Sequence, residues 1–141
     1  MHDAIHEPGR ADNEARSAAL VEVFGAALAM SDTAMTRVRG LILATAHAGS
    51  FVAPDATLIA DIDLAILAAG SAAYEQYRAG IRSEYAFAPE AAFRAGRIAF
   101  IESMLGRESI YHTPPFVHDK EQAARANPTH ELSELRIAPN A

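Results

Sequence analysis

Hydrophobic and polar positions alternate with a helical period along most of this chain. Apolar residues recur at intervals of three to four in five successive segments, at about residues 13–30, 32–48, 54–69, 71–87 and 89–105. That spacing places the apolar side chains on one face of a helix. Runs of β-branched and aromatic residues with a strand period are absent. The pattern therefore predicts five main helices.

Residues that begin and end helices stand at the edges of these segments. Asp12 and Ser31 occupy positions expected of N-cap residues, whose side-chain oxygens accept a hydrogen bond from the first turn. Residues 114–115 are two prolines and predict a loop. The last stretch reads as a helical tail, and Asn127-Pro128 is expected to break it because proline lacks a backbone donor.

Composition supports an all-α fold in a single domain. Half of the 141 residues are hydrophobic, and alanine, the best helix former, makes up roughly a quarter of the chain. A chain of this length can bury one sizeable core but is short for two. We therefore expect residues 1–141 to form one compact helical bundle of five main helices with a helical C-terminal tail.

The net charge and the absence of cysteine argue against several classes of function. A net charge of -6 argues against binding to a nucleic-acid backbone. The absence of cysteine excludes disulfides, cysteine-ligated zinc and a cysteine nucleophile. The first residues do not resemble a signal peptide, and no apolar run approaches the ~20 residues that span a bilayer. We expect a cytoplasmic protein that binds neither nucleic acid nor membrane.

The third helical segment holds the most unusual polar residues. Residues 56–69 are apolar on every side except for a threonine, Asp61 and Asp63, and a helix of that kind is expected to be buried. A buried carboxylate needs a metal, a cation or a proton. Asp63 is either a metal ligand or half of a structural ion pair with an arginine such as Arg37 or Arg39. Asp61 points about 200° away, and we assign it a supporting or capping contact.

Several segments, taken together and in order, resemble a group of predicted metal-dependent phosphohydrolases of the HD superfamily. The resemblance extends along essentially the whole chain. It is carried by residues 2–5 (His-Asp-Ala-Ile), 12–18, 44–47 (Ala-Thr-Ala-His), 61–67, 81–85, 93–97 and 110–113. It implies an HD-like helical domain that hydrolyses a small, nucleotide-like phosphate ester.

The resemblance also implies a metal site. In that family a histidine, an adjacent His-Asp pair and a distant aspartate hold the ion. The matching residues here are His2, Asp3 and Asp63. Imidazole and carboxylate ligands suit Mn²⁺, Zn²⁺, Fe²⁺, Co²⁺, Ni²⁺ or Mg²⁺, and the sequence does not rank them. Such an ion polarises a phosphoryl oxygen and acidifies a bound water.

The chain departs from the family at its start. Relatives carry about two helices, with the first histidine, before the His-Asp pair, and here that pair stands at positions 2 and 3. We therefore expect an incomplete site that binds metal weakly. The alternative is a non-catalytic HD remnant that binds a ligand or partner. Apolar surface left without those helices makes a homo-oligomer possible.

Two further residues are candidates for a catalytic role. His47 either contacts the substrate phosphate or a bound water, or is an ordinary histidine at a helix end. Glu14 either supports the site or is an acidic residue of a first helical turn. Arg82, Arg94 and Arg97 either bind phosphate or form surface ion pairs, and we expect the ion pairs. The glutamates expected as their partners are Glu84, Glu90 and Glu102.

Overall fold

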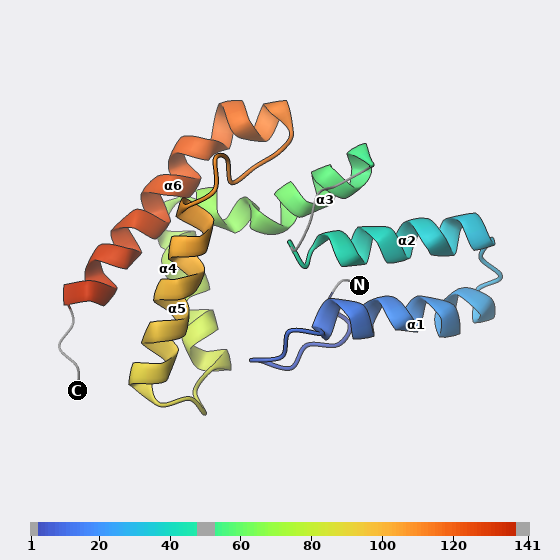
Figure 1. The fold of residues 1–141 in the computed structure, drawn as a ribbon, viewed down its shortest axis with the longest axis horizontal. Helices are drawn as coiled ribbons and strands as arrows, with labels where there is room; N and C mark the ends of the chain where they lie inside the picture. Colours follow the sequence, from blue (N-terminus) through green and yellow to red (C-terminus); the bar gives the residue numbers. More distant parts are fainter. Residues whose placement is uncertain (1–2, 48–52, 138–141) are drawn as a thin grey trace. The chain divides into compact units, whose positions relative to one another are not determined.

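The chain is built from α-helices, as its sequence predicts. The computed structural model describes residues 3–47 and 53–137, and within these ranges no strand is present. Figure 1 shows the elements in order. They are α1 (Asn13–Ala27), α2 (Asp32–Ala44), α3 (Pro54–Asp63), the 3₁₀ helix η1 (Leu64–Ala68), α4 (Ser71–Glu84), α5 (Glu90–Leu105) and α6 (Pro114–Ile137).

The chain divides into two compact units, Met1–Asp63 and Leu64–Ala141. The first unit contains α1 to α3, and the second contains η1 and α4 to α6. Each unit has its own hydrophobic cluster. The expectation of a single domain stays a prediction.

The first unit is organised around an antiparallel pair of helices. Helices α1 and α2 lie side by side and are joined by residues 28–31 (Figure 1). Ala18, Val21 and Ile42 form the core between them. Ser31 caps α2 as predicted, since its hydroxyl oxygen accepts from the Ala34 N–H at 3.3 Å. Asp12 stands at the N-cap of α1, but its side chain makes no capping bond and binds Arg10 instead.

The second unit packs η1 against α6. Its core contains Leu64, Leu67, Tyr74, Met104, Ile110, Tyr111 and Ala124. The hydroxyl of buried Tyr111 donates to the Leu64 carbonyl at 3.1 Å. The side-chain amide of Asn127 donates to the carbonyls of Leu67 and Ala69, both at 2.9 Å. These bonds satisfy carbonyls at the end of η1 that have no helical partner of their own.

The structure corrects three boundaries. The expected third helix changes at Leu64 from α to 3₁₀ geometry. The two prolines that predicted a loop begin α6 instead, because the missing N–H of proline costs nothing in a first turn. Pro128 lies inside α6 without ending it. Its ring is fully buried, and that packing opposes the cost of the lost backbone bond.

Among the described residues, no single helix is long and apolar enough to span a membrane. Residues Pro54–Ala68 and Ser71–Glu84 meet the length and composition criteria only when they are taken together as a bent pair.

Candidate functional site

Two residues that the sequence singled out separately meet in the first unit. Nε2 of His47 lies 2.9 Å from Oδ2 of Asp63, although the residues are 16 positions apart. A carboxylate only accepts hydrogen bonds, so the imidazole donates from Nε2. The side chains are 13% and 27% exposed. The contact joins the C-terminal end of α2 to the C-terminal end of α3, which pack against each other.

The second ring nitrogen of His47 is unusual. Nδ1 is buried and has no hydrogen-bond partner within the described part of the chain. His47 also has a positive φ of 51°, in the left-handed region. Ala29 has the same geometry just beyond α1, so this conformation is an ordinary way to leave a helix. The informative feature is the unsatisfied nitrogen, since buried polar atoms nearly always have partners.

Asp61, and not Asp63, is the fully buried carboxylate of α3. Asp61 is 0% exposed, whereas Asp63 is partly exposed. The expectation that α3 is buried on every side is also wrong, because Leu58 and Ile62 are 44% and 50% exposed. The sequence could not identify the buried face, since apolar residues surround α3 on all sides.

The arginines proposed as alternative partners of Asp63 bind elsewhere. Nε of Arg37 lies 2.6 Å from Oδ2 of Asp55. Arg39 pairs with Glu22. The two arginines named from the sequence therefore do not pair with Asp63, and the observed contact of Asp63 is with a histidine.

The segment that bears the His-Asp pair runs into the start of α1. Asp3 is described and exposed, and His2 lies outside the described residues. Because α1 and α2 are antiparallel, the start of α1 and the end of α2 lie at the same end of the hairpin (Figure 1). The His47–Asp63 contact and the start of α1, to which the segment bearing Asp3 leads, therefore lie at one end of the first unit.

Glu14 is half-buried in the first turn of α1, where its charge complements the helix dipole. Both of its roles considered from the sequence stay predictions.

Within residues 3–47 and 53–137, no group of three or more histidine or acidic side chains has the arrangement of a metal site. Since His2 falls outside these ranges, the proposed ligand set of His2, Asp3 and Asp63 also stays a prediction.

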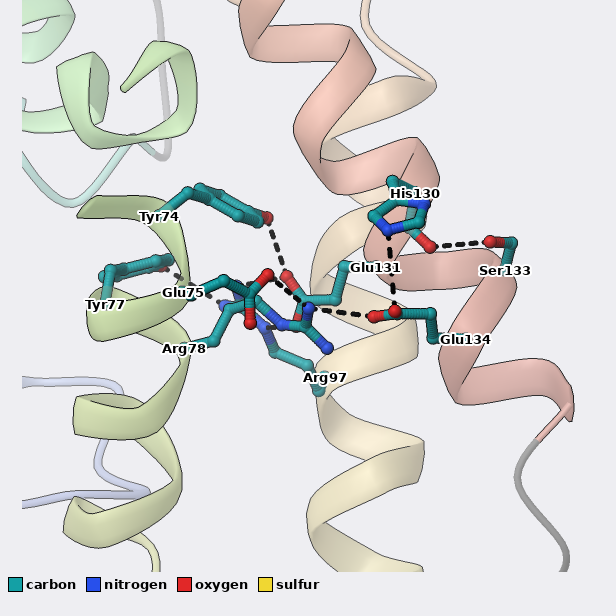
Figure 2. A network of polar contacts seen from close by, with 9 residues as sticks. All are labelled: Tyr74, Glu75, Tyr77, Arg78, Arg97, His130, Glu131, Ser133 and Glu134. Carbon is teal, nitrogen blue, oxygen red and sulfur yellow. Dashed lines mark hydrogen bonds and ion pairs between the residues drawn. The ribbon is translucent and has the colours of Figure 1, made fainter. Parts of the chain in front are cut away.

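The second unit holds a polar network that joins residues of α4, α5 and α6 (Figure 2), and the sequence did not predict it. Glu131 and Arg97 are buried and form a bidentate ion pair. Nε of Arg97 donates to Oε1 of Glu131 at 2.7 Å, and Nη2 donates to Oε2 at 3.0 Å. The Tyr74 hydroxyl donates to Oε2 of Glu131 at 2.6 Å. Such charge-assisted bonds are the strongest in proteins.

Burial and ion pairing shift the pKa values of Glu131 and Arg97 in opposite directions. Burial by itself would raise the pKa of Glu131, but the bonds from Arg97 and Tyr74 outweigh it and hold that pKa below its usual value. Burial disfavours the Arg97 cation, yet the bonds to Glu131 and Tyr77 raise its pKa. Burial and the bond to Glu131 raise the pKa of Tyr74. Both charges of the pair therefore persist inside the unit at neutral pH.

Aromatic rings and outer ion pairs complete the network (Figure 2). The guanidinium carbon of Arg97 lies 5.1 Å from the ring centroid of Tyr77 and 5.1 Å from that of Phe100. Arg78 bridges Glu75 at 2.7 Å and Glu134 at 2.8 Å. The expectation of a surface ion pair for Arg97 is wrong, because its partner is supplied by α6 and not by its own helix. The network satisfies its charges internally, so we assign it a structural role.

No family model, curated protein or solved structure matches the chain in the comparisons made with each.

Proposed function

We propose that the protein is a divalent-metal-dependent phosphohydrolase that acts on a small, nucleotide-like phosphate ester. The observation that carries the proposal is the contact between His47 Nε2 and Asp63 Oδ2 at 2.9 Å. The sequence resemblance points to both residues independently. Their meeting at the end of the hairpin that also carries Asp3 supports a common site.

His2, Asp3 and Asp63 would hold the ion. Their donor set, one imidazole and two carboxylates, fits a divalent metal. When bound, such an ion supplies Lewis-acid polarisation of the phosphoryl oxygen and a more acidic water. The partly exposed Asp63 can be reached from solvent, and the fully buried Asp61 cannot. This difference favours Asp63 over Asp61 as the ligand.

His47 orients Asp63 in this proposal. Its Nε2–H donates to Oδ2, which fixes the plane of the carboxylate. Carboxylate–imidazole contacts around metal sites commonly hold ligands in this way. With the proton on Nε2, the buried Nδ1 is an acceptor that has no partner among the described residues, and through it His47 would accept a hydrogen bond from a water.

The test is a Mn²⁺ titration by calorimetry, combined with phosphate release from p-nitrophenyl phosphate. Asp63→Asn keeps the size of the side chain and removes its charge, so we expect Mn²⁺ affinity to fall at least tenfold with helix content unchanged. Asp55→Asn is the matched control, because Asp55 lies on the same helix and its side chain binds Arg37 and the Ala56 N–H. The Mn²⁺ affinity of the Asp55→Asn variant should stay within about twofold of that of the wild type.

Equal Mn²⁺ affinity of the two variants would refute the assignment of Asp63. A wild-type chain that binds no Mn²⁺, Zn²⁺ or Ni²⁺ would refute the proposed function and leave the non-catalytic alternative.

A further inference from the structure

The segment before α1 is held by two buried polar side chains. Ser17 is 0% exposed, and its Oγ accepts from the Ile5 N–H at 3.0 Å and donates to the Ile5 carbonyl at 3.2 Å. Asn13 is 8% exposed; its Oδ1 accepts from the Glu7 N–H at 3.0 Å. Its Nδ2 donates to the carbonyls of Glu7 at 3.0 Å and Arg10 at 3.3 Å.

These contacts resemble the pairing that a neighbouring strand would provide. Each side chain binds both a donor and an acceptor of the non-helical backbone at Ile5 and Glu7. An ion pair between Arg16 and Glu7, at 2.6 Å, adds to them. We call the side chains of Asn13 and Ser17, with the backbone they bind, the N-terminal clasp. Buried polar groups of this kind need such partners, and here the partners all come from one segment.

We propose that Asn13 and Ser17 are positioning residues for the metal site, because the N-terminal clasp fixes the segment that carries Asp3. This inference rests on the proposed function. Asp3 is two residues from Ile5, so a fixed Ile5 keeps the Cα of Asp3 within about 7 Å of one point.

The location of the clasp connects it to the other proposed ligand. Asn13 and Ser17 lie in the first turns of α1, at the end of the hairpin where α2 ends. His47 and Asp63 meet beyond that end of α2. The clasp thus attaches the segment bearing Asp3 to the same rigid helix pair that supports Asp63. A site on rigid elements keeps its ligands in register, which a free chain end does not.

A purely structural clasp would affect stability alone, so the experiment measures metal affinity and stability separately. Ser17→Ala removes both bonds to Ile5 and keeps a good helix former. Ser31→Ala is the matched control, because it makes the same chemical change and removes a helix-capping bond at the opposite end of the hairpin. Asn13→Ala is a second test variant. Mn²⁺ affinity is measured by calorimetry, the melting temperature by circular dichroism, and protection of the Ile5 and Glu7 amides by hydrogen exchange.

We expect Ser17→Ala and Asn13→Ala to weaken Mn²⁺ binding at least tenfold and to abolish protection of these amides. Ser31→Ala should lower the melting temperature but leave affinity within about twofold. If wild type binds Mn²⁺ and loses it in Asp63→Asn, yet Ser17→Ala binds normally after its Ile5 amide loses protection, the clasp inference alone is overturned. If wild type binds no metal, the proposed function fails, and the positioning role fails with it.

Discussion

Replacing Glu131 by glutamine tests the network in the second unit most directly. The side chain of Glu131 is 4% exposed and accepts two bonds from Arg97 and one from Tyr74. Removing one partner of a buried ion pair costs about 3–5 kcal/mol, because the remaining charge is left without compensation. Glutamine keeps one carbonyl oxygen as an acceptor, so we expect a loss near the lower limit, about 3 kcal/mol.

Glu134→Gln is the matched control for this substitution. Glu134 lies three residues along α6 and pairs with Arg78 at 2.8 Å, but its side chain is 47% exposed. Exposed pairs contribute about 0–1 kcal/mol, because water screens the charges and the side chains lose freedom. The two variants make the same chemical change on one helix, and burial is the main difference between them.

The assay is urea unfolding followed by far-ultraviolet circular dichroism, since the chain has no tryptophan to report by fluorescence. A lower midpoint with an unchanged slope would report lost stability. A further variant that combines Tyr74→Phe, Arg97→Met and Glu131→Leu should recover most of the loss, because neither charge remains buried. Equal losses for Glu131→Gln and Glu134→Gln would refute the reasoning.

Two more predictions follow from the pKa shifts. The pKa values of Glu131 and Glu121 are held below the usual 4.5, so their stabilisation is complete above pH 4.5 and lost as the pH falls through the lowered values; urea midpoints that stay constant from pH 6 to pH 3 would contradict this. The raised pKa of Tyr74 means that this tyrosine should ionise late in an alkaline absorbance titration. Tyr74→Phe should remove that late step and cost about 1–3 kcal/mol, because Glu131 loses a bond.

Local sequence patterns were sufficient to predict most of the helices. Apolar spacing, alanine content and the Ser31 cap depend on neighbours within one or two turns, and the observed helices follow them. The same rules failed where tertiary packing decides whether a segment is helical. Residues 114–115 could begin a helix as readily as form a loop, and Pro128 is tolerated within α6 because its ring is buried.

Part of the candidate site could be predicted and part could not. The sequence singled out His47 and Asp63 through the family resemblance, but their contact appeared only with the structure. The roles of Asn13 and Ser17 were missed, since a serine or asparagine near a helix start usually signals nothing more than a cap. Their burial against Ile5 and Glu7 depends on how the preceding segment folds back.

The sequence by itself determined that this chain is all-α and where its helices lie, because helix formation is a local property repeated every few residues. Only the tertiary structure decided that Asp61 is the buried carboxylate of α3, and that Arg97 binds Glu131 from 34 positions away. The physical reason is that burial and ion pairing depend on which helix faces pack together. In an alanine-rich helix that is apolar on several sides, the sequence permits more than one face to be buried.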